Sequence, residues 1–152
     1  MRTVRARLVV ALATAMLFSA AGAQGDSVPT VDVEDAVAHW VNTVNDGDAA
    51  GFAALHTSDV LARHTDGVVE FGTSAMARWA RELHEAGLHV VLDDVIGEAL
   101  TADWVYARAG FTTLDTAGEL ESSGVWYAVL RRTDDGWRFY RTHELVGRAA
   151  AH

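Results

Sequence analysis

The segment His39–His56 constrains the fold of this chain more than any other. Apolar residues recur at three-to-four spacing up to Val44, which is the pattern of one buried helical face. Asn45-Asp46-Gly47 interrupts the pattern, because these residues favour the conformations that end a helix, and Asp48 can cap a second one. Phe52 supplies the apolar face of that second helix. We therefore predict a helix, a sharp break and a shorter helix.

Two further local signals follow. Asp66-Gly67 lies between the segments 61–65 and 68–71, and this dipeptide is typical of tight hairpin turns. Apolar residues then recur with helical spacing over 73–85, and Gly87 stands where a helix commonly ends in the left-handed conformation. The sequence therefore predicts a hairpin followed by a third helix.

From Leu88 onward the hydrophobic period changes from 3.6 to 2, which indicates strands. Turn-forming residues divide this half of the chain into four expected strands, 89–100, 103–114, 120–132 and 137–146. Long neighbouring strands of this kind predict a strongly curved antiparallel sheet with helices packed on its concave face. The expected fold class is therefore α+β, with the sheet wrapped around three N-terminal helices.

The first 23 residues have the composition of an export signal. A basic start, an apolar run and small residues at the cleavage position follow one another: Arg2, Arg5 and Arg7, then 8–20, then Ala21-Gly22-Ala23. We expect cleavage before Gln24 and a periplasmic or secreted protein. A retained N-terminal anchor is the alternative, although the apolar run is short for a membrane span. Residues 24–30 then form a flexible lead, 31–147 the folded domain and 148–152 a frayed tail.

Charge and composition exclude several classes of function. After cleavage the chain has nine arginines against twenty-one carboxylates, a net charge of about −12. This balance disfavours nucleic acid and anionic membrane surfaces as partners, since both require a cationic surface. The chain contains neither cysteine nor lysine, so thiol nucleophiles, Schiff-base lysines and disulfides are impossible.

Several short sequences within these elements resemble the nuclear transport factor 2-like superfamily, which includes SnoaL-like polyketide cyclases, ketosteroid isomerases and scytalone dehydratase. They are Trp40-Val-Asn-Thr-Val-Asn-Asp-Gly-Asp48, Phe52-Ala-Ala-Leu55, Asp66-Gly67, 103–112, 127–132 and 135–139. The chain looks closest to uncharacterised, often exported members with Gly-Trp-Arg in the final strand. The resemblance implies a cone-shaped domain with an internal pocket between sheet and helices, often a homodimer through the outer sheet face. Enzymes and non-enzymes share this scaffold.

The resemblance also allows a comparison with ketosteroid isomerases, which use a tyrosine, a carboxylate base and a protonated aspartic acid. Aligning the helix break puts Trp40 at the tyrosine position and His64 at the base position. The later acid falls near 124–126, where this sequence has none. Tryptophan donates only through its indole N–H and cannot act as an acid. Ketosteroid isomerase chemistry is therefore not expected.

Three residues are candidates for catalysis. His64 precedes the hairpin turn, where an imidazole entering the cone would serve as a general base; the alternative is a partly exposed turn histidine. Arg141 and His143 lie two apart on the last strand and share a face. If Phe139 also points inward, Arg141 binds a carboxylate or oxyanion and His143 relays a proton. Otherwise Arg141 forms a structural ion pair. The opposite face, with Glu144, is expected to be solvated.

The expected ligand pocket is aromatic. Its candidate residues are Trp40, Trp79, Tyr106, Tyr127 and Phe139, although aromatic stripes on strands more often belong to a core or a dimer surface. Motifs that would hold a metal or a phosphate are absent from the sequence, so neither a metal nor a cofactor is expected.

Three functional hypotheses remain open at this point. The first is an exported pocket protein that binds a small apolar molecule. The second is an acid–base enzyme (isomerase, cyclase, dehydratase or hydrolase) that uses His64, Arg141 and His143. The third is a dimerisation or accessory module.

Overall fold

The computed structural model describes residues 30–149 of the chain, and the predicted signal segment 1–23 lies outside them. The three helices are α1 (Thr30–Asn45), α2 (Ala49–Ala54) and α3 (Thr73–Glu85). The strands are β1 (His56–Arg63), β2 (Val69–Phe71), β3 (His89–Thr101), β4 (Trp104–Leu114), β5 (Leu120–Thr133) and β6 (Gly136–Ala149). No helix among these residues is long and apolar enough to cross a membrane.

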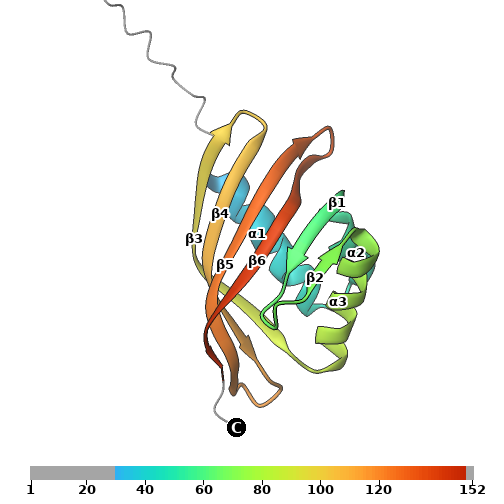
Figure 1. The fold of residues 1–152 in the computed structure, drawn as a ribbon, viewed down its shortest axis with the longest axis vertical. Coiled ribbons are helices and arrows are strands. Elements are labelled where there is room, and N and C mark those ends of the chain that lie inside the picture. Colours follow the sequence, from blue (N-terminus) through green and yellow to red (C-terminus); the bar gives the residue numbers. More distant parts are fainter. Residues whose placement is uncertain (1–29, 150–152) are drawn as a thin grey trace, which may run out of the picture.

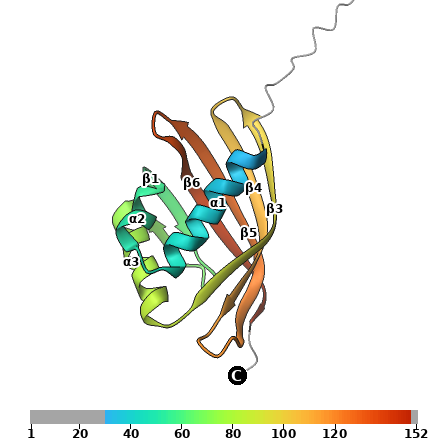
Figure 2. The ribbon, with the colours of Figure 1, turned by 180° about the vertical axis from the view of Figure 1, so that it is seen from behind.

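The six strands form one curved, open sheet in the order β2-β1-β6-β5-β4-β3 (Figure 1). All neighbours are antiparallel except β1 and β6, which run parallel. Helix α1 crosses the concave side of the sheet, while α2 and α3 lie beside β1 (Figure 2). The predicted α+β class, with a curved sheet around three helices, is confirmed.

The helix break forms as its sequence predicts. Gly47 adopts a positive φ of 72°, which ends α1, and Asp48 Oδ1 accepts a hydrogen bond of 2.9 Å from Gly51 N at the start of α2. This side chain satisfies one of the backbone donors that the first turn of a helix leaves free. The hairpin at Asp66-Gly67 forms too, with His64 N donating to Val68 O at 3.0 Å.

An aromatic cluster forms the centre of the core. Trp40 is 2 % exposed, and its ring lies 5.0 Å from that of Phe52, 5.6 Å from Trp126 and 6.3 Å from Phe139. Its indole Nε1 donates to His56 Nε2 at 3.3 Å, while His56 Nδ1 donates to Phe52 O at 2.8 Å. Both imidazole nitrogens are therefore used, and burial lowers the pKa of His56 to about 4.

One extra residue in β6 determines which side chains reach the interior. Leu130 pairs with Phe139 but the preceding residue, Val129, pairs with Arg141, so Tyr140 is a β-bulge. Phe139 is inward and 1 % exposed. Beyond the bulge, the inward positions are those that pair with buried residues of β5: Thr142 with Ala128 and Glu144 with Trp126.

The C-terminal boundary differs slightly from the prediction. β6 continues to Ala149, so residues 148 and 149 belong to the strand and not to a tail. The predicted lead 24–30 lies outside the described residues, apart from Thr30 in α1.

Candidate functional site

A cavity of about 210 Å³, here called the inner cavity, lies between α3 and the concave side of β3–β6. Apolar and polar side chains share its wall about equally, and the polar ones come from the loop after β1, from β4, from the start of β5 and from β6. Its lining residues are Thr65, Trp79, Leu83, Leu88, Val90, Leu92, Phe111, Thr113, Glu121, Ser122 and Glu144.

Glu144 is the chemically distinctive group of the inner cavity. Removal from water raises its pKa to about 7, the negative charge of Asp66 adds to this rise, and a backbone hydrogen bond from Thr65 opposes it. A carboxyl group with such a pKa exchanges protons readily near neutral pH. Sequence reasoning placed Glu144 on a solvated face, and that placement is wrong because the Tyr140 bulge turns it inward.

His64 lies in a second, shallower hollow, the His64 pocket, which it lines with Thr65, Asp66, Val68, Glu70, Trp79 and Glu82. Its Nε2 is 3.3 Å from Glu70 Oε2, and its ring stacks on Trp79 with 4.9 Å between centroids. Burial lowers the pKa of His64, although the charge of Glu70 opposes this. Glu70 is also paired with Arg78. Because Thr65 and Trp79 line both hollows, the indole of Trp79 separates His64 from the inner cavity.

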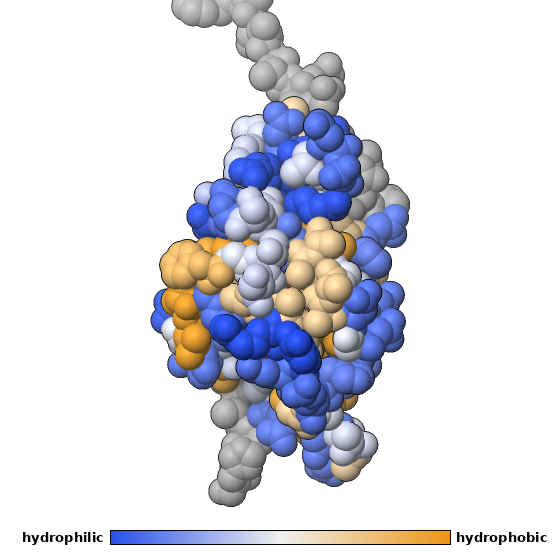
Figure 3. Space-filling model, turned by 90° about the vertical axis from the view of Figure 1, so that its right-hand side faces the viewer, coloured by the Kyte–Doolittle hydropathy of each residue, from blue (hydrophilic) through white to orange (hydrophobic). Residues whose placement is uncertain are grey.

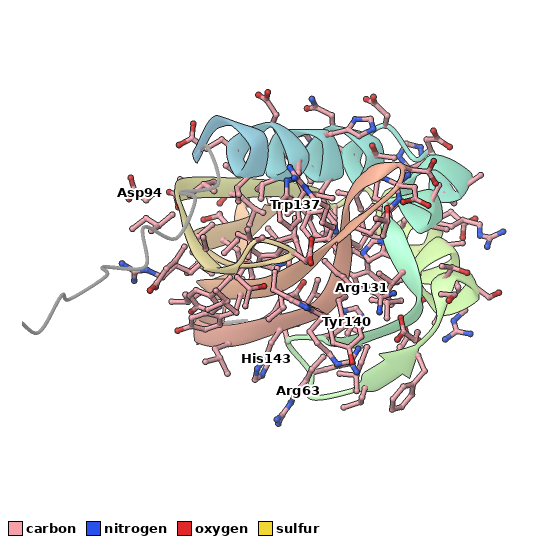
Figure 4. All side chains as sticks on the ribbon, turned by 90° about the horizontal axis from the view of Figure 1, so that it is seen from above. Arg63, Asp94, Arg131, Trp137, Tyr140 and His143 are labelled. Atoms are coloured by element: carbon pink, nitrogen blue, oxygen red, sulfur yellow. The ribbon has the colours of Figure 1, made fainter. Side chains whose placement is uncertain are left out.

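Arg141 and His143 do not join His64. Both lie on the convex side of the sheet, here called the outer face, where they line a small hollow with Tyr106 and Tyr127. Figure 4 shows His143 projecting beside Arg63 on the side of the sheet away from α1. The predicted convergence of the three residues on one cavity is wrong, since the Tyr140 bulge breaks the alternation that would have kept Arg141 on the face of Phe139.

The five predicted pocket residues divide into three groups. Trp79 lines the inner cavity. Trp40 and Phe139 lie in the core cluster at 2 % and 1 % exposure and do not line that cavity. Tyr106 and Tyr127 alternate with the buried residues of β4 and β5, so both point to the outer face. There their rings stack with 6.1 Å between the centroids.

Comparison with models of known protein families shows to which family the chain belongs. A sequence model of the SnoaL-like domain matches residues 30–143, which is almost all of the described region. The chain belongs to the SnoaL-like family. Among curated proteins, none matches this SnoaL-like sequence.

Solved structures agree with the SnoaL-like fold. A protein of unknown function from Mycobacterium tuberculosis, solved with an Asp-to-Asn substitution, is 22% identical with a TM-score of 0.71, over 79% of this chain and 77% of that one. A putative dehydratase from the NTF2-like family of Streptomyces avermitilis is 21% identical with a TM-score of 0.69, over 79% and 96%. A putative scytalone dehydratase from Novosphingobium aromaticivorans is 12% identical with a TM-score of 0.70, over 80% and 86%. At these identities the likeness shows the fold alone.

The outer face of this SnoaL-like domain is rich in aromatic and arginine side chains. The Arg131 guanidinium lies 5.8 Å from the Trp104 ring and 5.5 Å from the Tyr140 ring, and Arg141 also contacts Tyr140. At the edge of the sheet, Val69 and Phe71 of β2 are 45% and 68% exposed. Figure 3 shows hydrophobic surface gathered at one edge of the molecule next to largely hydrophilic surface. Exposed apolar surface of this kind is typical of interaction sites.

Metal ligands do not cluster in the described part of the SnoaL-like domain: residues 30–149 contain no group of three or more histidine, aspartate or glutamate side chains that could hold a metal ion.

Proposed function

We propose that this protein binds a small, mostly apolar molecule in the inner cavity, with Glu144 next to the polar part of that molecule. The supporting observation is the composition of the wall. Trp79, Leu83, Leu92 and Phe111 supply an apolar part of the wall, and Glu144 supplies an ionisable group beside it. Pockets of this kind use few polar groups to orient a ligand that apolar contacts hold.

The size of the inner cavity limits the ligand. An apolar cavity of about 150 Å³ is large enough to bind benzene. The inner cavity, at about 210 Å³, therefore suits a molecule with one ring and a short substituent. A polycyclic ligand would require the wall to move, and Trp79 is the wall residue whose displacement would join the inner cavity to the His64 pocket.

An acid–base enzyme is the second candidate, and the pKa of Glu144 favours it. A group with a pKa of about 7 is suited both to remove and to return a proton at neutral pH. Two of the structural neighbours are described as putative dehydratases, a reaction class that requires such proton transfers. In this case Glu144, in place of Arg141 and His143, would be the group that transfers protons. His64 would take part only if Trp79 moved aside.

Two further parts of the proposal concern location and assembly. The N-terminal sequence supports export to the periplasm or the medium. The aromatic outer face, with the exposed Val69 and Phe71 at its edge, supports a homodimer through that face.

The ligand proposal is tested by native mass spectrometry of the mature protein purified from its own host. We expect a bound molecule of low mass in the unmodified protein. Leu92→Trp, which fills the inner cavity, should abolish that species, while Glu98→Gln on the outer face should leave it unchanged. A bound molecule that persists in Leu92→Trp would place the ligand elsewhere and contradict the proposal.

The dimer is tested separately by sedimentation velocity. Tyr127→Arg places a second cation beside Arg141, so like-charge repulsion and lost stacking should shift a dimer to monomers. Glu34→Arg, at an exposed position of α1 on the other side of the molecule, serves as the control. Unmodified protein that sediments as a monomer at high micromolar concentration would contradict assembly through this face.

A further inference from the structure

We propose that the ligand of the inner cavity is a cationic amine attached to an apolar body. This inference rests on the proposed function and adds the chemical class of the ligand. It follows from the signs of the charges around the cavity and from the aromatic and aliphatic side chains in its wall.

Every ionisable side chain that lines the inner cavity is a carboxyl group. These are Glu121 and Glu144, and no arginine or histidine lines it among residues 33–147, whose side chains the structure describes. Acidic groups also prevail just beyond Trp79, where Asp66, Glu70 and Glu82 line the His64 pocket. Arg78, a cation beside that pocket, is already paired with Glu70 and Glu82. A ligand in the cavity therefore meets negative charge without a compensating positive side chain.

A positive charge on the ligand would offset the cost of holding an ionised carboxyl group in the cavity. Removal of Glu144 from water disfavours its ionised form, and an ammonium group beside this carboxyl group would favour it. A carboxylate ligand, by contrast, would face two like charges with no arginine to accept it. The net charge of about −12 on the mature chain also attracts cations over a longer range.

The apolar walls identify the rest of the molecule. Trp79 and Phe111 present aromatic rings to the cavity, and Leu83, Val90 and Leu92 complete the apolar surface. Aromatic rings attract cations through their faces and also pack against a hydrocarbon or ring on the ligand. A bare divalent ion fits this wall poorly, since the described residues contain no group of three or more acidic or histidine side chains that could hold one. An ammonium group on an apolar body matches both halves of the lining.

The test compares three probes of similar size: 2-phenylethylamine, 2-phenylethanol and phenylacetate. Isothermal titration calorimetry on the mature protein at pH 7.5 should show the amine binding at least about tenfold tighter than the alcohol, with phenylacetate weakest. Between pH 5.5 and 7.5 the amine affinity should rise about tenfold, because Glu144 ionises over this range while the amine stays protonated. The alcohol affinity should not rise.

Two variants separate this inference from the proposed function. Glu144→Gln should weaken the amine roughly tenfold or more and remove the pH dependence of its binding, while the alcohol affinity stays within about twofold. Leu92→Trp, or Val90→Phe if the first fails to fold, should abolish binding of every probe by filling the cavity.

The outcomes that contradict the inference are distinct. If the alcohol or the carboxylate binds as tightly as the amine, and Leu92→Trp abolishes that binding, the amine class is wrong and the cavity remains the ligand site. If amine binding persists in Leu92→Trp, the amine binds elsewhere and the inference fails. If none of the three probes binds, both the ligand class and the proposed one-ring ligand are contradicted.

Discussion

Trp40→Phe is expected to lower the free energy of unfolding by about 2–4 kcal/mol. The substitution removes the indole N–H that donates to His56 Nε2 and so leaves a buried acceptor without a partner, which costs about 1–3 kcal/mol. The smaller ring also leaves a void in a close-packed cluster, which costs about 1 kcal/mol more. Urea denaturation at pH 7.5 measures the change.

Trp126→Phe is the matched control, because it removes the same atoms from the same cluster. Trp126 is 1 % exposed, and its Nε1 has no hydrogen-bond partner within the described part of the chain. Its replacement should therefore cost only the packing contribution of about 1 kcal/mol. Equal losses for the two variants would show that the bond between Trp40 and His56 contributes nothing to stability.

Glu144→Gln is expected to stabilise the protein by about 3 kcal/mol at pH 8 and hardly at all at pH 4. The folded-state pKa of Glu144 is about 7 against an ordinary value of 4.5, so the folded state binds this proton more tightly than the unfolded state does. The glutamate therefore destabilises the fold progressively as pH rises from about 4.5 to 7, at about 1.4 kcal/mol for each unit of pKa difference. Glutamine removes this penalty.

The pH profile of the same variant also shows in which direction the titration of His56 changes stability. His56 has a pKa of about 4 in the fold against 6.5 ordinarily, so its contribution is complete above about pH 6.5 and is lost as pH falls towards 4. The lowered pKa of His64 acts in the same direction. In the unmodified protein the rise from His56 and the fall from Glu144 overlap and largely cancel. In Glu144→Gln we expect stability to rise by about 3 kcal/mol between pH 4 and 6.5.

Chemical denaturation at half-unit steps of pH measures both profiles, with Glu98→Gln as the exposed control. That control should keep the nearly flat profile of the unmodified protein. A profile for Glu144→Gln parallel to that of the unmodified protein would show that Glu144 titrates normally, and its assignment as the polar group of the inner cavity would then lose its main support.

Most of the fold follows from local sequence. The helix break at Gly47 and Asp48, the hairpin at Asp66-Gly67 and the change of period at Leu88 each depend on the chemistry of neighbouring residues. Such signals are readable because backbone conformation and short-range hydrogen bonds decide them. The resemblance to one superfamily then supplied the arrangement of the elements, and the family match agrees with it.

The candidate site was predicted much less well, and one assumption explains most of the difference. Strict alternation along the last strand puts Arg141 and His143 on the face of Phe139. The bulge at Tyr140 depends on how β6 pairs with β5, and no residue type in that stretch marks it. The bond from Trp40 to His56 was equally hidden, since it joins two elements through the core.

The Tyr140 bulge also has a consequence for how such chains diverge. Loss of the Tyr140 codon would make β6 regular and leave its faces unchanged, because Arg141 already forms the pair that follows Phe139, with Val129 next to Leu130. Arg141 and His143 would stay outward, and Thr142 and Glu144 would stay inward. A chain of this family can thus lose the bulge through a single-residue deletion and keep the same residues in its cavity. An alignment that does not place the gap at Tyr140 would instead compare inward residues of one relative with outward residues of another.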